Sequence, residues 1–250
     1  AIQPLSFITA FKSVLCGVTF SLNTPNRIGE YGGRILFDQN GNLVISTGER
    51  SVLATRPLAQ SLTASLGKVL RITKEGQPAS GNPTFSGAGA LPELYSYGHR
   101  NPQGLAIHPV TKEIWESEHG PRGGDELNRI KAGSNYGWPT ITYGIEYSGQ
   151  PIGDAIQQKE GMEQPVTYWV PSIATCGVAI VTSDRYPEWK GNILVGGLAG
   201  MQIARVELDG TKYSKQETLL KDIGRVRQVS ESPDGYIYAV TEATGLMVKL

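Results

Sequence analysis

Residues 97–138 hold most of the side chains in this sequence that are suited to chemistry. All three histidines of the sequence lie here, and two of them, His99 and His119, are candidates for chemistry. A turn bracketed by glycines, at residues 98–104, presents Arg100 and Gln103, whose side chains donate hydrogen bonds. Binding residues commonly lie on loops that a rigid scaffold holds in place. The turn therefore predicts a contact site for an anionic or carbonyl-rich ligand.

An acidic loop follows at residues 118–126, with the sequence EHGPRGGDE. Its three glycines and one proline leave backbone carbonyls free to point inward, and the carboxylates of Asp125 and Glu126 follow directly. Carbonyls and carboxylates together are the ligand set of a hard cation such as calcium. Spacing alone leaves two interpretations open, a cation site and a solvated turn with surface charges.

Apolar strands alternate with turns along the chain and predict an all-β fold. Four segments share an apolar strand, a turn with Asp, Pro or Gly, and a second apolar strand; they span residues 33–50, 104–121, 177–199 and 225–243. Hairpins that recur at intervals of about 50 to 70 residues are typical of β-propeller blades, which stack around an axis to bury both sheet faces. Short helices are expected at residues 58–65 and 155–163, and a single helical turn at residues 125–131.

The composition is that of an ordinary folded protein. The 250 residues are 39% hydrophobic, carry no net charge, and include the many glycines and prolines that short strands require. Zero net charge and the lack of a basic run argue against nucleic acid or an anionic membrane surface as a partner. We expect no membrane span, because no apolar run reaches about 18 residues. Lys12 interrupts the nearest one, residues 6–22, where a buried strand or helix is expected rather than a signal peptide.

Three motifs together resemble one known family. They are GHRNPQGLAIHP from residue 98, EHGPRGGDELN from residue 118 and NYGWP from residue 135. In this order and spacing they resemble the glucose/sorbosone dehydrogenase family, whose members are soluble, pyrroloquinoline-quinone-dependent aldose sugar dehydrogenases built as six-bladed β-propellers. The resemblance runs from about Gly32 to the C-terminus. It implies that residues 1–250 form a single β-propeller domain that lacks the family's N-terminal blades. Four blade-like repeats against the family's six leave a fragment, a shortened protein and a smaller closed propeller as alternatives. If the first blades are missing, two sheet edges would be exposed unless something covers them.

The resemblance also implies an activity and its cofactors. The expected reaction oxidises aldose sugars to lactones with bound pyrroloquinoline quinone (PQQ) and calcium, and passes the electrons to an external acceptor. The protein's part in such a reaction is to bind, orient and stabilise charge, because the cofactor carries the redox step. Family members further imply a periplasmic or secreted location.

Several residues match positions that contact the quinone in the family. Arg100 would lie against the reactive quinone carbonyls, with Asn101 and Gln103 as further contacts. Arg225 and Arg227 would bind the cofactor's carboxylates as a pair. Their alternate positions on a predicted strand project both side chains from one face.

Two further residues leave alternatives open. His119 either touches the cofactor or packs as a structural histidine, since a neutral imidazole serves both roles. Trp169 lies in an apolar run, residues 166–176, where core packing is expected. Its flat ring is nevertheless a candidate wall for a planar ligand.

The same resemblance implies metal ligands. Gly120 and Pro121 would give backbone carbonyls to the cofactor's calcium, which acts as a Lewis acid on the quinone. Asp125 would be a supporting carboxylate near this calcium. Glu126 and the backbone of Tyr136 match a second, structural calcium site.

Some positions depart from the family pattern. Glu30 stands where the family has a histidine as general base, and its reference pKa of about 4.3, against about 6.5 for histidine, makes it a weaker base. Glu49 stands at the position of the usual acidic partner, and Ala199 replaces a lysine that binds the cofactor in many relatives. The departures keep a second interpretation open, a non-catalytic, calcium-stabilised propeller that binds a sugar or a protein. A calcium-dependent lactone hydrolase is a third, which the carbonyl-rich loop fits poorly.

Overall fold

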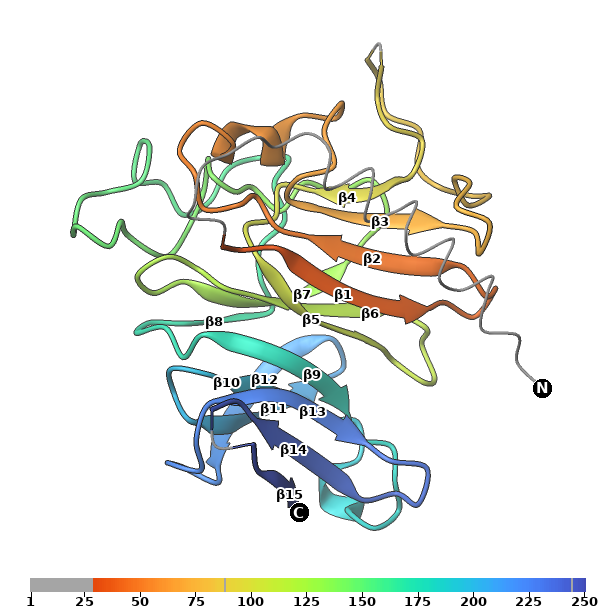
Figure 1. Ribbon diagram of the computed structural model, residues 1–250, viewed down its shortest axis with the longest axis vertical. Coiled ribbons are helices and arrows are strands. Elements are labelled where there is room, and N and C mark those ends of the chain that lie inside the picture. Colours follow the sequence, from red (N-terminus) through yellow and green to blue (C-terminus); the bar gives the residue numbers. More distant parts are fainter. Residues whose placement is uncertain (1–28, 88, 244) are drawn as a thin grey trace.

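The computed structural model describes residues 29–87, 89–243 and 245–250, and this part of the chain forms four antiparallel sheets (Figure 1). Sheet 1 contains β1 (Gly32–Phe37), β2 (Leu43–Thr47), β3 (Lys68–Ile72) and β4 (Leu94–Tyr97). Sheet 2 contains β5 (Pro102–Ile107), β6 (Ile114–Glu118), β7 (Asp125–Ile130) and β8 (Thr167–Trp169). Sheet 3 contains β9 (Thr175–Ile180), β10 (Ile193–Gly197), β11 (Gln202–Asp209) and β12 (Lys212–Leu219). Sheet 4 contains β13 (Val226–Glu231), β14 (Ile237–Thr241) and β15 (Met247–Lys249).

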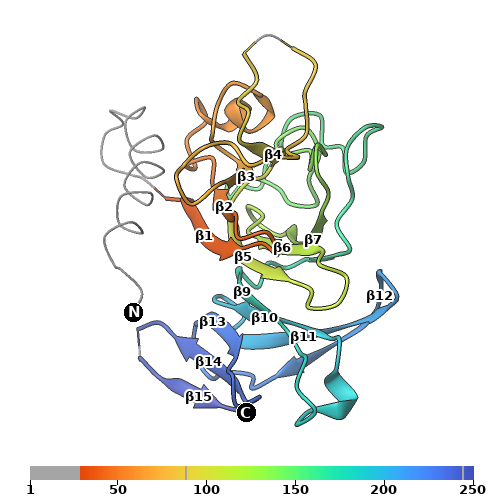
Figure 2. The ribbon, with the colours of Figure 1, turned by 90° about the vertical axis from the view of Figure 1, so that its right-hand side faces the viewer.

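The sheets follow one another in the chain and in space (Figure 2). Their first strands, β1, β5, β9 and β13, contact each other in that order. The four predicted hairpins are the first two strands of the four sheets, so the all-β prediction and its repeats are confirmed. Glu30, Arg100 and Arg225 each lie within two residues of the start of a first strand. The repeat therefore brings these distant residues to one end of the assembly.

Buried side chains on both faces of the inner strands hold neighbouring sheets together. Every residue of β2, β3, β6, β9 and β10 is buried. Ile114 packs with Val44 between sheets 1 and 2, while the next residue, Trp115, packs with Val178 between sheets 2 and 3. Successive residues of a strand point to opposite faces, so one strand contributes to two interfaces. Burial of this apolar surface is the main force that aligns the sheets.

The outward faces of sheets 1 and 4 carry exposed apolar side chains. In β1, Ile35 and Phe37 are exposed, whereas Leu36 between them packs toward sheet 2. In sheet 4, Val240 and Met247 are exposed. This exposure lies on two sheet faces. Faces of this kind are the surfaces on which further sheets pack in a stacked architecture.

The prediction of a helical turn at residues 125–131 is wrong. This segment is β7, an interior strand of sheet 2, in which Asp125 pairs with Trp169 and Glu126 with Glu118. The polar residues of β7 are buried beside its apolar ones, so the alternation that marks a half-buried strand is hidden.

The two predicted short helices have different outcomes. A 3₁₀ helix at Arg56–Gln60 overlaps the one predicted at residues 58–65. Residues 155–163 are not helical and contain a turn and two isolated β-bridge residues. Within the described ranges, no helix is long and apolar enough to cross a membrane. The element predicted at residues 6–22 lies outside the described residues.

Lys68, at the start of β3, fastens the preceding loop to sheet 1. Its side chain is fully buried, and Nζ donates hydrogen bonds to the carbonyls of Leu58 (2.8 Å), Ala59 (2.8 Å) and Leu66 (2.5 Å). An ammonium group has three N–H donors, so all three are used.

Replacing Lys68 with methionine is expected to destabilise the fold. Methionine fills a similar volume but leaves three buried carbonyls without a donor, so the free energy of unfolding should fall by about 3 kcal/mol. Urea unfolding followed by circular dichroism measures the change. Lys74→Met, in the exposed turn after β3, is the control and should stay within about 0.5 kcal/mol of the parent. Equal stability of Lys68→Met and the parent would contradict this role.

Candidate active site

Arg100, in the loop between β4 and β5, lies at the centre of a buried polar site. Its guanidinium forms an ion pair with Glu30 just before β1 (Nη2–Oε1, 2.5 Å). Nη1 donates to the backbone carbonyls of His119 (3.0 Å) and Gly120 (2.7 Å), both in the β6–β7 loop. The guanidinium lies 5.2 Å from the centroid of the Trp138 ring. One buried cation thus joins three of the predicted segments.

Glu118, the last residue of β6, fixes the backbone beside Arg100. Its Oε2 accepts hydrogen bonds from the backbone N–H groups of Arg100 (2.5 Å) and Asn101 (3.3 Å). Its Oε1 lies 3.3 Å from Nδ1 of His99, whose ring stacks on Tyr136. Bonds from N–H groups to a carboxylate are among the stronger hydrogen bonds of proteins. They hold the β4–β5 turn against the β6–β7 loop and make His99 a structural residue of the site.

Glu49, two residues after β2, is the acidic neighbour of Glu30. Burial, followed by a hydrogen bond with the Glu30 carboxylate, raises the pKa of Glu49 from its ordinary 4.5 to about 8. The backbone keeps the pair together, because Gly48 packs so closely on the Glu30 carbonyl that a Cβ there would have no room. At neutral pH Glu49 is therefore protonated beside Glu30, which in turn pairs with Arg100.

Arg225 and Arg227 form a second cationic group at β13. Both guanidiniums pair with the carboxylate of Glu242, each at 2.5 Å, and these two bonds hold the pKa of Glu242 below its ordinary range. Arg227 Nη1 also donates to Gln103 Oε1 (3.1 Å), which links sheet 4 to sheet 2. The prediction that the two arginines project from one face is confirmed. Both remain partly exposed, so a ligand can reach them.

Arg34, in β1, belongs to this group although the sequence assigned it no role. Nη1 donates to Gln228 Oε1 (2.5 Å), Nη2 to the carbonyl of Arg227 (2.9 Å), and Nε to the carbonyl of Gln103. It therefore ties sheet 1 to sheets 2 and 4. The sequence did contain a signal for this role, because Arg34 is a charged residue that directly follows two glycines and precedes an apolar run.

Asp125, at the start of β7, positions the Gly120 peptide. Its Oδ1 accepts from the Gly120 N–H (2.9 Å), and its two oxygens accept from Ser172 Oγ (2.8 Å each). Burial raises the pKa of Asp125. A side chain at Gly120 would collide with the backbone of Gly123 and Gly124, so only glycine fits. The Gly120 carbonyl is thereby held toward Arg100, while that of Pro121 has no hydrogen-bond donor among the described residues.

Three carboxylates surround the side-chain amide of Asn128. Its Nδ2 donates to Glu116 (3.1 Å), Glu118 (3.1 Å) and Glu126 (3.2 Å). Burial, followed by the charge of Glu118, raises the pKa values of Glu116 and Glu126 well above the ordinary range. One ligand atom each from His99, Glu116 and Glu118 lie within 4.8 Å of one another. The cluster has the oxygen-rich chemistry of a cation site.

A small cavity lies beside this cluster, between the β6–β7 loop and residues 136–142. Glu118, Glu126 and Tyr136 line it together with Arg100. Its volume of about 10 Å³ is the space of one water-sized group. The two residues matched to a structural calcium, Glu126 and Tyr136, are therefore brought to one cavity.

The structure separates the two residues that the sequence left ambiguous. His119 lies in the site, and burial, followed by the charge of Arg100, lowers the pKa of His119 to about 4, so its imidazole is neutral. Trp169 is a correction. It is 5% exposed in the hydrophobic cluster between sheets 2 and 3, and its Nε1 donates to Gln216 Oε1 (2.8 Å). The strand alternation of β8 turns this ring inward, so it packs in the core and forms no wall of the site.

A family model described as Glucose / Sorbosone dehydrogenase matches residues 18–249. The chain belongs to this family. Aldose sugar dehydrogenase YliI of Escherichia coli is 41% identical over 249 residues, covering 98% of this chain and 65% of that protein. The apo form of the soluble E. coli aldose sugar dehydrogenase matches with a TM-score of 0.83 at 40% identity, over 90% of this chain and 66% of that one. The PQQ-bound aldose sugar dehydrogenase from Streptomyces coelicolor matches with a TM-score of 0.69 at 33% identity, over 86% and 56%.

These similarities confirm the resemblance drawn from the three motifs and the propeller-type arrangement of the sheets. They also set its extent, because the chain spans less than two thirds of the length of YliI. The site residues predicted from the motifs lie in the part that is matched.

The raised pKa of Glu49 predicts a pH-dependent stability that Glu49→Gln should remove. A group whose folded pKa lies above its unfolded pKa stabilises the fold below the unfolded value and loses that effect as pH rises through the folded value. The parent should therefore lose stability relative to Glu49→Gln between about pH 4.5 and pH 8, by at most about 1.4 kcal/mol per pH unit.

Urea unfolding of both proteins at intervals from pH 4.5 to 9 gives this difference directly. Glu75→Gln, in the exposed turn after β3, is the matched control and should follow the parent at every pH. A constant difference between the parent and Glu49→Gln across the range would show that Glu49 is not protonated in the folded site.

Proposed function

We propose that this protein is a sugar oxidoreductase that oxidises aldoses to lactones with bound PQQ and calcium and passes the electrons to an external acceptor. The observation that carries the proposal is the Arg100 site, in which a buried guanidinium, the carboxylate of Glu30 and the protonated acid of Glu49 lie together. Family membership and the aldose sugar dehydrogenases of E. coli and S. coelicolor support sugar oxidation, and the PQQ of the latter structure supports the cofactor. A periplasmic or secreted location is proposed from the family resemblance.

The polar groups of the site fit a planar cofactor that carries carboxylates. Arg225 and Arg227 offer two forked guanidiniums on one side, which is the chemistry that recognises carboxylates. Arg100 Nε and His119 Nε2 are buried, and neither has a hydrogen-bond partner within the described residues. Buried polar atoms are usually paired, so these two are available to a ligand. When bound, the quinone supplies the two-electron acceptor and calcium the Lewis acid.

Asn101 and Gln103 extend the same surface between Arg100 and Arg227. The Gln103 amide is held on both sides, because Nε2 donates to Asn101 Oδ1 (3.1 Å) and Oε1 accepts from Arg227 (3.1 Å). A side chain fixed at both ends loses little entropy when a ligand binds. These two residues would therefore orient the cofactor between the two cationic groups.

The oxygen groups of the β6–β7 loop fit calcium. The carbonyls of Gly120 and Pro121 would hold the cofactor's calcium, with Asp125 fixing the Gly120 peptide. The Gly120 carbonyl already accepts from Arg100, so its second lone pair would serve the metal. Glu126 and the backbone of Tyr136 would hold a second calcium in the small cavity that they line.

The chain's own residues then act on the sugar. Oxidation of an aldose at its anomeric carbon removes a hydride from that carbon and a proton from its hydroxyl. Glu30 accepts the hydroxyl proton on its carboxylate. Glu49 stays neutral beside Glu30, and Arg100 orients Glu30 and stabilises the negative charge that develops in the site.

A second candidate is a non-catalytic propeller that binds a sugar or a protein. Two observations favour it. Glu30 is already engaged in a 2.5 Å ion pair with Arg100, which reduces its availability as a base. Ala199 lies exposed beyond β10 and offers no charge where many relatives carry a lysine.

Arg225→Gln and Arg227→Gln are each expected to weaken cofactor binding at least about tenfold, because each removes a charged donor pair. Titration of the apo chain with PQQ and calcium, followed by quinone absorbance, measures the affinity. Arg185→Gln, in the β9–β10 loop, is the matched control and should bind like the parent. Unchanged affinity in both site variants, or no binding by a folded parent, would sink the quinone proposal.

Glu30→Gln is expected to lower dye-linked glucose oxidation at least about 100-fold while cofactor affinity stays the same, because the amide keeps the shape and loses the base. Glu30→His should remain active, since an imidazole can accept the same proton. Turnover in Glu30→His together with none in the parent would support the binding-protein candidate instead. Full activity in Glu30→Gln would show that the base lies elsewhere.

A further inference from the structure

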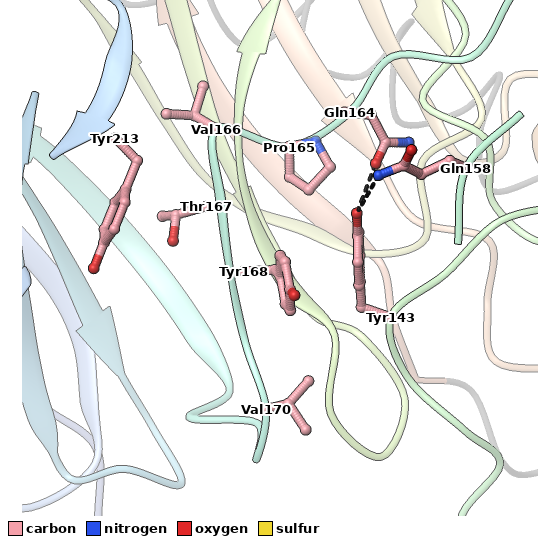
Figure 3. A pocket seen from close by; sticks show the side chains of 9 residues that line it. All are labelled: Tyr143, Gln158, Gln164, Pro165, Val166, Thr167, Tyr168, Val170 and Tyr213. Atoms are coloured by element: carbon pink, nitrogen blue, oxygen red, sulfur yellow. Dashed lines mark hydrogen bonds between the residues drawn. The ribbon is translucent and has the colours of Figure 1, made fainter. Parts of the chain in front are cut away.

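A wide groove lies on the outer side of the molecule, between β8 of sheet 2 and β12 of sheet 3 (Figure 3). Tyr143, Gln158 and Gln164 of the β7–β8 loop form one side, Tyr168 of β8 lies along the middle, and Tyr213 of β12 lies on the other side. The volume is about 690 Å³. Small-molecule sites commonly occupy about 300–1,000 Å³, so the groove is large enough for a ligand of several rings.

The aromatic wall of the groove is fixed by contacts within the chain. The rings of Tyr143 and Tyr168 stack with centroids 3.8 Å apart and planes 12° from parallel. Tyr143 Oη donates to Gln164 Oε1 (2.7 Å) and accepts from Gln158 Nε2 (3.4 Å). A wall that is ordered before binding loses little entropy when a ligand arrives.

The core contact of Trp169 sets the width of the groove. Trp169 points inward from β8 and donates to Gln216 of β12 (2.8 Å), so it ties together the two strands that carry Tyr168 and Tyr213. By strand alternation, an inward Trp169 turns its neighbour Tyr168 outward, where it is 45% exposed. Tyr213 is 43% exposed. Two tyrosines from different sheets are thus held at a set separation with their rings accessible.

The chemistry of the lining selects a neutral ligand. Among the residues that the structure describes, no charged side chain lines the groove. The lining instead offers tyrosine rings, two glutamine amides, the Thr167 hydroxyl and small apolar groups such as Val170. A phosphate or carboxylate ligand would require a cationic partner. A sugar ring presents an apolar C–H face to an aromatic ring, and its hydroxyls pair with amide and hydroxyl groups. We propose that this groove is a binding site for a neutral oligosaccharide.

The groove is separate from the Arg100 site, although its end borders the same loop. Val170 lies at one end of the groove, and a Cβ at Gly123 would lie 3.4 Å from its side chain. The Gly124 N–H donates to the carbonyl of Trp169 (2.8 Å). An oligosaccharide in the groove is therefore anchored beside the β6–β7 loop and needs no quinone or calcium to bind, so this proposal stands apart from the proposed redox function.

Isothermal titration of the apo chain with cellotetraose and with maltotetraose tests the proposal. At least one of the two should bind saturably at millimolar concentration without added quinone. Tyr168→Ala and Tyr213→Ala should each weaken that binding at least about tenfold, because each removes one aromatic face. Tyr168→Phe should keep most of the affinity, which separates ring contact from loss of folding.

Tyr147→Ala is the matched control, since Tyr147 is exposed but does not line the groove. It should bind like the parent. No saturable binding of either tetrasaccharide by a folded parent would overturn the proposal. Binding that persists unchanged in Tyr168→Ala and Tyr213→Ala would overturn it as well, because the sugar would then lie elsewhere.

Discussion

The carboxylate of Glu118 holds together the two loops on which the site depends. One oxygen accepts the backbone N–H groups of Arg100 and Asn101, and the other faces His99 and Asn128. The turn that presents Arg100 belongs to the chain before sheet 2, whereas Glu118 ends an interior strand of that sheet. The interaction therefore fixes the β4–β5 turn, which as a loop has no ladder of its own, to the interior strand β6. It fixes the backbone from which the Arg100 side chain extends, while Asp125 and Glu30 fix the Gly120 peptide and the guanidinium itself.

This arrangement concentrates negative charge where water is excluded. Glu116, Glu118 and Glu126 share the single amide donor of Asn128, and one oxygen of Glu116 has no hydrogen-bond partner among the described residues. Unpaired buried carboxylates are costly and must be neutralised. Protons can do this, as the raised pKa values of Glu116 and Glu126 indicate, and so can a cation. In the cluster and the small cavity beside it, a bound cation would therefore take the place of these protons.

The sequence predicted the parts of the fold that depend on residues close together in the chain. Each first hairpin carries its own turn chemistry and apolar runs, so all four were found. The segment at β7 was misread, because burial of Asp125 and Asn128 depends on partners in other loops and strands. Arg34 and Glu242 were missed for a related reason. One partner of the Arg34 guanidinium, Gln228, lies 194 positions away in sequence. Residue spacing within one segment cannot predict such a contact.

The site could be located from the sequence to the extent that its residues lie in short motifs. Arg100, Gln103 and Asp125 lie in these motifs, close in the chain to other polar residues of the site. The structure places the motifs side by side. Trp169 shows the limit. The sequence shows that Trp169 lies in an apolar segment. Which face of the strand meets the neighbouring sheet depends on how the sheets stack, and in this structure the face that carries Trp169 packs in the core.

The motif resemblance places Glu30 where the family has a histidine, and the charges around Glu30 fit such an exchange. A neutral histidine beside an ionised acid, the two residue types of the family motif, would together carry one negative charge. Here Glu30 pairs with Arg100, and burial raises the pKa of Glu49 to about 8, so Glu49 is neutral at lower pH. The two acids therefore present one negative charge to one guanidinium. The two patterns differ in which residue carries the proton and agree in net charge. A site that needs one net negative charge beside its arginine can hold a glutamate in place of a histidine, provided that the neighbouring acid is buried enough to stay neutral. The tight packing of Gly48 on the Glu30 backbone supplies that condition, because it holds both carboxyl groups in the same enclosed space.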